Sequence, residues 1–108
     1  MIFSPNGPIT DLLILSVIAR GDAYGYQISQ ILKKVSNTKD SALYPILKRL
    51  QENGYVTTYD QPFLGRNRKY YTMTPQGRSQ WEMLKKAWAS FKIDVDEIVE
   101  RGEWDEQS

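Results

Sequence analysis

Apolar residues occupy nine of the thirteen positions from residue 8 to residue 20 and would lie on nearly all sides of a helix, whereas later segments alternate apolar and polar positions. Proline is tolerated at a first helical position and Gly21 follows the run, so the pattern predicts a helix over residues 8–20. A helix that is apolar all round must be covered on every side, which is difficult for a small domain. We expect a second subunit to cover it; burial inside a single chain is the alternative.

Two shorter amphipathic helices are predicted next, separated by a polar loop. The second helix follows a turn at residues 21–25 and continues to about Ser36. Its single apolar face consists of Ile28, Ile31, Leu32 and Val35. The third begins near Asp40 or Ser41, either of which can serve as N-cap, and ends at the left-handed stop favoured by Gly54. Its apolar stripe consists of Leu43, Ile46, Leu47 and Leu50.

β-Branched and aromatic residues then predict two strands, residues 55–60 and residues 68–73. A loop over residues 61–67, with Gly65 at its tip, joins them into a hairpin. Strands of this composition, connected by a short polar segment, are typical of the wing in a winged helix-turn-helix.

A long last helix completes the pattern. Thr74 is a suitable cap, Pro75 a suitable first residue, and the helix is expected to reach about Arg101. The predicted fold class is mostly α (α+β). We assign residues 1–74 to a winged helix-turn-helix DNA-binding domain, and residues 75–108 to a C-terminal dimerisation helix with an acidic tail.

Composition excludes several classes of function. The 108-residue chain contains neither Cys nor His, which removes disulfides, thiolate metal sites, and the commonest general base and metal ligand. We therefore expect a protein that is not an enzyme and needs no cofactor. No apolar run could span a bilayer and no leader peptide precedes the first helix, so a cytoplasmic location is expected. Without His or Cys nearby, four acids are expected to form a solvated face rather than a metal site: Asp94, Asp96, Glu97 and Glu100.

The distribution of charge is more informative than the net charge of +1. Residues 20–78 contain ten basic and four acidic side chains, whereas residues 79–108 contain four basic and eight acidic ones. A basic body joined to an acidic tail indicates a polyanionic partner.

The third helix presents polar residues opposite its apolar stripe. Ser41, Tyr44 and Lys48 are the candidates for base or phosphate contact in a major groove, and Lys39, just before the helix, suits a phosphate. Glu52 faces the same way and would repel phosphate, so the contact surface should end near Lys48. Each of these residues could instead be merely solvated, and Tyr44 could lean on the hairpin.

The hairpin tip gathers Arg66, Arg68 and Lys69 within four positions. Such a tip suits DNA phosphates or a narrow minor groove. Strand alternation places Arg68 with Tyr70 on one face and Lys69 with Tyr71 on the other. We expect one tyrosine to pack on the core and the other to brace a basic side chain. The alternative is an edge hairpin charged only to prevent aggregation.

The last helix contains a heptad-like seam. Its spacing of 3, 4, 3, 4, 3 joins Trp81, Leu84, Trp88, Phe91, Val95 and Ile98. The seam predicts a homodimer about a two-fold axis; folding back onto the chain's own first helix is the alternative, and both can be partly true. At the middle of the seam, Trp88 either lines a slot for a small planar aromatic ligand or only packs the interface.

Several motifs together resemble the PadR family of bacterial transcriptional regulators. They are Tyr24-Gly25-Tyr26-Gln27-Ile28, Leu43-Tyr44-Pro45-Ile46-Leu47-Lys48-Arg49-Leu50, Asn53-Gly54-Tyr55-Val56, Gly65-Arg66-Asn67-Arg68-Lys69-Tyr70-Tyr71 and Thr74-Pro75-Gln76-Gly77. The resemblance implies a homodimeric repressor that a small molecule releases from a pseudo-palindromic double-stranded DNA operator. It assigns the recognition helix to Ser41, Tyr44 and Lys48, and the wing to Arg66, Arg68 and Lys69.

The leading hypothesis is therefore a sequence-specific DNA-binding repressor. The alternative is a winged-helix protein–protein interaction module whose basic face docks an acidic partner. Sequence preference distinguishes them, because a repressor must prefer its operator well above random DNA.

Overall fold

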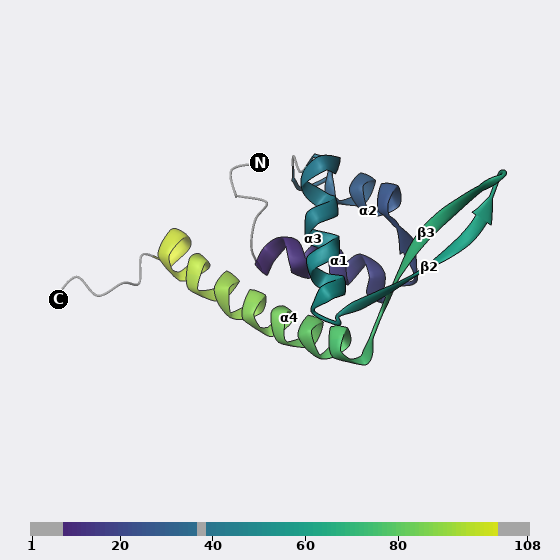
Figure 1. Cartoon of the computed structure of the whole chain (residues 1–108). Helices are drawn as coiled ribbons and strands as arrows, with labels where there is room; N and C mark the ends of the chain where they lie inside the picture. Colours follow the sequence, from purple (N-terminus) through teal and green to yellow (C-terminus); the bar gives the residue numbers. More distant parts are fainter. Residues whose placement is uncertain (1–7, 37–38, 102–108) are drawn as a thin grey trace.

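The structure is a computed structural model that describes residues 8–36 and 39–101. Its elements are α1 (Pro8–Ala19), β1 (Ala23–Tyr24), α2 (Gly25–Leu32), α3 (Asp40–Glu52), β2 (Val56–Phe63), β3 (Arg66–Met73), α4 (Pro75–Asp96) and a π-helical turn, η1 (Glu97–Arg101). The hairpin and α4 project from the helical body in different directions (Figure 1). The expected winged helix-turn-helix with a long C-terminal helix is confirmed. The acidic residues beyond Arg101 and the segment before Pro8 lie outside the described residues.

The sheet is larger than the sequence pattern predicts. It has three antiparallel strands in the order β1-β3-β2, and β1 lies in the segment predicted to be only a turn. The expected loop over residues 61–67 is also wrong, because β2 and β3 stay paired as far as Phe63 and Arg66. Only Leu64 and Gly65 form the turn, both with positive φ, as a tight two-residue hairpin requires. Pro62 is accommodated because β2 is an edge strand.

The core surrounds α1. Its fully buried side chains include Ile14, Leu15, Ile28, Leu43, Leu47, Leu50 and Val56. Ile46 is partly buried against them, so the predicted apolar stripe of α3 is confirmed. Four apolar residues of α1 and Thr10 are buried within the single chain, and Ile9, Leu13 and Val17 are half-buried. Most of α1 is thus covered by the chain itself, contrary to the cover by a second subunit that we expected.

The second helix is shorter than predicted. It ends at Leu32, four residues before Ser36. Ile28 and Leu32 are buried, but Ile31 and Val35 are 39% and 46% exposed. Half of the expected apolar face is therefore open to solvent, and Val35 lies beyond the end of the helix. Ile31 and Val35 instead line an open groove of about 480 Å³ against Leu13 and Val17 of α1.

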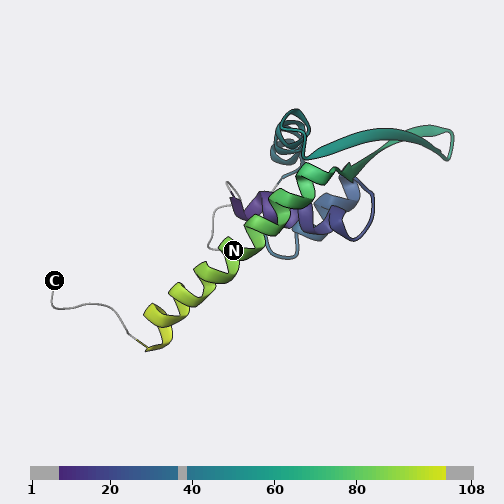
Figure 2. The ribbon, with the colours of Figure 1, turned by 90° about the horizontal axis from the view of Figure 1, so that it is seen from below.

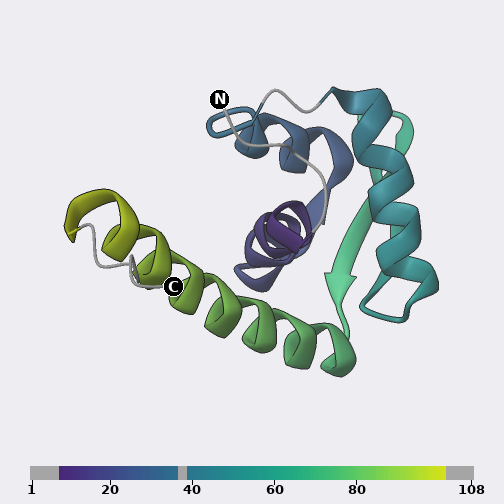
Figure 3. The ribbon, with the colours of Figure 1, turned by 90° about the vertical axis from the view of Figure 1, so that its left-hand side faces the viewer.

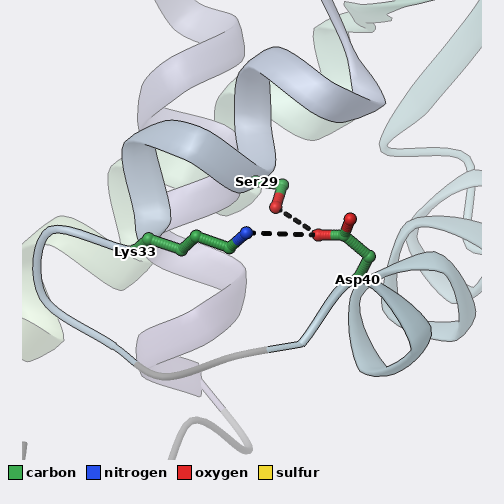
Figure 4. Close-up of polar contacts among 3 residues, drawn as sticks. All are labelled: Ser29, Lys33 and Asp40. Atoms are coloured by element: carbon green, nitrogen blue, oxygen red, sulfur yellow. Dashed lines mark hydrogen bonds and ion pairs between the residues drawn. The ribbon is translucent and has the colours of Figure 1, made fainter.

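The start of α3 also differs from the prediction. Lys39, rather than Asp40 or Ser41, is at the N-cap position, and it makes no side-chain capping hydrogen bond. Asp40 accepts a hydrogen bond of 2.5 Å from the hydroxyl of Ser29 in α2, and Lys33 Nζ lies 3.9 Å from the same carboxylate oxygen (Figure 4). Ser29 is a buried residue of α2 and Asp40 is the first residue of α3, so this contact links the two helices directly.

The first turns of α4 belong to the body. As predicted, Thr74 caps the helix: its Oγ1 accepts a hydrogen bond from the Gly77 N–H at 2.9 Å and donates one to the Gly54 carbonyl at 2.6 Å. Further along, Trp81 Nε1 donates to Ser16 Oγ of α1 at 2.9 Å. Figure 2 shows α4 crossing α1 and then continuing past it.

We predict that Gly77→Ala destabilises the protein, although alanine normally favours a helix over glycine by up to about 1 kcal/mol. A Cβ at residue 77 would lie 1.9 Å from the Tyr55 carbonyl oxygen, so the backbones would have to move apart. The expected loss is about 2–4 kcal/mol in the free energy of unfolding, measured by urea denaturation. Ser79→Ala, at an exposed position of the same helix, is the control and should change stability by less than about 0.5 kcal/mol. A stabilised Gly77→Ala variant would contradict the close contact.

We predict that Asp40→Ala lowers the free energy of unfolding by about 1–2 kcal/mol, because the buried Ser29 hydroxyl loses its acceptor. Lys33→Ala, which removes only the longer and half-exposed ion pair, should cost less than about 0.5 kcal/mol. Thermal or urea denaturation of both variants measures the difference. Equal losses would show that the ion pair, and not the hydrogen bond, links the two helices.

Candidate nucleic-acid interface

The outer face of α3 presents the predicted polar residues to solvent. Lys39, Ser41, Tyr44 and Lys48 are exposed, whereas Leu43, Leu47 and Leu50 on the opposite side are buried. The ring of Tyr44 lies against Gly25, where a Cβ would lie 3.0 Å from its hydroxyl oxygen. Tyr44 is still 51% exposed. It therefore leans on the start of α2 and keeps part of its ring and hydroxyl available.

Arg49, at the flank of this face, has an internal partner. Its Nη2 lies 2.6 Å from Oδ1 of Asp11 in α1. The hydrogen bond with Asp11 raises the pKa of the Arg49 guanidinium above its usual value. Within residues 8–36 and 39–101, no salt bridge involves Lys48. Of the two adjacent cations, Lys48 is thus the one available to a ligand, and Arg49 joins α3 to α1.

The wing, formed by β2 and β3, presents its three cations unequally. Arg66 and Lys69 are exposed. Arg68 is half-buried, with its guanidinium carbon 4.0 Å from the centre of the Tyr24 ring and 3.6 Å from that of Phe63. The sequence pattern treats the three as one group, but the structure places Arg68 between two aromatic rings.

The two tyrosines of β3 also differ. Tyr71 is 6% exposed and packs on the core, as expected of one of them, and burial raises the pKa of its hydroxyl. The expectation that the other tyrosine braces a basic side chain is wrong. The Tyr70 ring lies edge-on to the Tyr24 ring, with ring centres 5.5 Å apart, and is stacked on the Tyr59 ring, with ring centres 5.6 Å apart. The bracing of Arg68 comes from Tyr24 and Phe63.

A hydrogen bond ties this aromatic group to the α1–α2 connection. The Tyr59 hydroxyl donates to Oδ2 of Asp22 at 2.7 Å, which raises the pKa of Tyr59 above its usual value. The sequence gives only a weak signal of this arrangement: Tyr59 falls at an alternate strand position, whereas Tyr24 and Asp22 belong to a segment predicted to be a turn.

The predicted seam of α4 is divided into two parts. Trp81 and Leu84 pack on α1 of the same chain, which is the folding-back alternative. The remaining residues face outward: Trp88 is 38% exposed, Phe91 49% and Ile98 60%, and Val95 is half-buried. Trp88 and Phe91, with ring centres 6.1 Å apart, border an open apolar groove of about 310 Å³. Pro8, Ile9, Leu12, Leu84 and Ala87 complete its lining.

Other kinds of site find little support in the part of the chain that the structure describes. Residues 8–36 and 39–101 contain no group of three or more acidic or other ligand side chains placed to hold a metal ion. Over the same residues, no helix is both long and apolar enough to cross a membrane. The arrangement that stands out is a pair of basic surfaces, α3 and the wing, which lie on one side of α1 while α4 lies on the other (Figure 3).

Comparison with known proteins agrees with this geometry. Residues 14–83 match the model of the transcriptional regulator PadR-like family. The structure is similar to that of smu.1704 from Streptococcus mutans, with 42% identity, 93% of this chain and 94% of that chain covered, and a TM-score of 0.87. It is also similar to a PadR family transcription regulator from Clostridium difficile, with 29% identity, 82% and 96% covered, and a TM-score of 0.76.

A third similar structure contains a ligand. It is Bacillus subtilis PadR in complex with operator DNA, with 26% identity and a TM-score of 0.64. The match covers 68% of this chain and 45% of that chain, so this chain spans about half the length of that regulator. The family model covers well over half of this sequence, in the segment that forms the helix-turn-helix and the wing. The chain belongs to the PadR-like family of transcriptional regulators, which are not enzymes.

Proposed function

We propose that this protein is a homodimeric repressor that binds a pseudo-palindromic DNA operator through α3 and the wing. The observation that supports this most directly is the position of the exposed face of α3 beside the basic hairpin, on the side of α1 away from α4 (Figure 3). A helix fits the major groove, and cations on a hairpin that extends beyond it reach the adjacent backbone. The operator complex of the Bacillus subtilis relative is consistent with this use of the fold.

The exposed residues of α3 suit different roles. Lys48 and Ser41 can hydrogen-bond to base edges, and Tyr44 offers a hydroxyl for a phosphate or a ring edge for a thymine methyl. Lys39 precedes the helix and suits a phosphate. Among the wing cations, Arg66 and Lys69 are exposed and also suit phosphates.

The open part of the seam supports the dimer. Trp88, Phe91 and Ile98 are large apolar side chains left exposed along one stripe of α4. Two such helices packed antiparallel about a point between Trp88 and Phe91 would place Trp88 of each copy opposite Phe91 of the other. That pairing covers the stripe and generates the two-fold symmetry that a pseudo-palindromic operator matches.

We assign the effector site to the same region. The groove beside Trp88 and Phe91 is almost wholly apolar and has two aromatic rings at its edge. Such a surface suits a small planar aromatic ligand, which binds by stacking. A ligand bound in this groove, between α1 and α4 and beside the proposed dimer contact, would alter the separation of the two recognition helices and so weaken operator binding.

Lys48→Ala should weaken binding to an operator duplex, selected from a random DNA pool, by about 1–3 kcal/mol. If Lys48 contacts a base edge, the variant should bind the operator more weakly but bind other duplexes as the wild type does. If Lys48 contacts a phosphate, the substitution weakens binding to all duplexes evenly and reduces the steepness of log affinity against log salt by about 0.9 per protomer. Gel-shift titrations at several salt concentrations distinguish these cases. Lys86→Ala, the same charge change on exposed α4, is the control. Unchanged affinity for every duplex would remove Lys48 from the interface.

Trp88→Ala should leave the protein dimeric but abolish its binding of planar aromatic dyes, because the stacking surface is lost while the rest of the seam remains. Sedimentation measures the dimer, and dye fluorescence measures binding. Ile98→Ala removes an apolar contact of the seam that is not part of the groove. It should weaken the dimer but leave dye binding unchanged at protein concentrations where the dimer forms. A monomeric Trp88→Ala variant, from a wild type that binds no dye, would leave Trp88 as an interface residue only.

A further inference from the structure

The outer half of the wing needs support from outside its own strands. Strand β1 pairs with β3 only through Ala23 and Tyr24, opposite Tyr71 and Tyr70. Residues 60–69 are therefore a two-stranded ribbon, and an isolated ribbon of this kind is only marginally stable in water. Yet a wing that contacts DNA must hold a defined direction relative to α3, since a mobile one has to be ordered on binding.

Arg68 is placed where it can give that support. It lies in the ribbon, and its guanidinium is stacked between Phe63 of β2 and Tyr24, the residue that directly precedes α2. Arginine suits this position because its flat guanidinium can stack on a ring with each face. Tyr70 also contacts the Tyr24 ring, edge-on. The stack thus connects the distal wing to the start of the helix-turn-helix.

The orientation of Arg68 agrees with this connection. Tyr71 faces the core, and alternation places Lys69 on the same side of the strand as Tyr71. Arg68 belongs to the other side, with Tyr70. Lys69 and Arg66 are exposed, but Arg68 is half-buried. The two exposed cations are free to meet phosphates, while the guanidinium carbon of the third lies 4.0 Å and 3.6 Å from the centres of two rings.

We propose that Arg68 is a positioning residue: clamped between Tyr24 and Phe63, it fixes the direction of the wing relative to α3, and Arg66 and Lys69 make the phosphate contacts. This inference rests on the proposed binding of DNA. It divides the three wing cations, which look equivalent in the sequence, into one that orients the hairpin and two that contact DNA phosphates.

The test compares Arg68→Met, Arg68→Lys, Phe63→Leu and the double variant Arg68→Met/Phe63→Leu, with Lys69→Met as the matched control cation. Operator affinity is measured at several salt concentrations. A positioning role predicts that Arg68→Met and Phe63→Leu each weaken binding by about 4- to 25-fold, because each of two protomers loses a contact worth a factor of about 2 to 5. The double variant should be no weaker than either single variant, and the salt slope should stay at the wild-type value.

Arg68→Lys separates stacking from charge. It keeps the positive charge but loses the planar stack, so the clamp predicts a loss close to that of Arg68→Met. Lys69→Met, in contrast, should lower the salt slope by about 0.9 per lysine contact. Backbone ¹⁵N order parameters of the DNA-free protein add an independent measurement: residues 60–69 should become more mobile in Arg68→Met and Phe63→Leu, and stay unchanged in Lys69→Met.

Opposite results would overturn the clamp. They are an Arg68→Lys variant that binds like wild type, an Arg68→Met variant with a lowered salt slope, or a wing whose order parameters do not respond to Phe63→Leu. Each would indicate a phosphate contact or a residue without effect on the wing. A wild-type protein that binds no duplex above background would instead overturn the proposed DNA binding, while the order parameters would still decide whether the clamp orders the wing.

Discussion

The structure depends on the burial of α1, a helix without a polar stripe. Leu12, Ile14, Leu15 and Ile18 are all buried within the single chain, so elements must pack around α1 from several directions. The core residues of α2 and α3 cover one part, and α4 covers another through Leu84 and the Trp81–Ser16 hydrogen bond. The Asp11–Arg49 pair then fixes α3 to α1 at the edge of this core. Since all these elements share one partner, their relative positions are set together.

This arrangement decides which charges remain for a ligand. Arg49 is held by Asp11, Arg68 by two rings, and Lys85 Nζ lies 3.7 Å above the ring of Trp81. The exposed cations of α3 and the wing are those left on the side away from α4. A net charge near zero is therefore compatible with a polyanion-binding surface, because the acidic residues are concentrated elsewhere, toward the C-terminal end of α4.

The long helix α4 has two environments along its length. Its first turns are fixed by the Thr74 cap and by contact with α1, whereas the stripe beyond Leu84 is exposed. The groove at Trp88 and Phe91 lies where these two parts meet, and Ile9 and Leu12 of α1 form its other wall. Anything bound in that groove touches both the dimerisation surface that we propose and the helix around which the proposed DNA-binding elements pack. The proposed effector site and the proposed operator-binding surface would thus both contact α1.

Local signals along the chain were sufficient to predict the four α-helices and the two strands of the hairpin: apolar spacing indicates the helices, and β-branched and aromatic residues indicate the strands. Leu43, Leu47 and Leu50 are buried as that spacing requires, and Thr74 caps α4 as its residue type suggests. Strand β1 has only two residues, too few to show a period, and it exists because β3 offers an edge for pairing. The environment of Arg68 is likewise tertiary, since Tyr24 reaches it only through that pairing. The sequence by itself determined the helices and the two strands of the hairpin, because each has a local signal; the packing of distant segments added β1 and decided which side chains remain free to act.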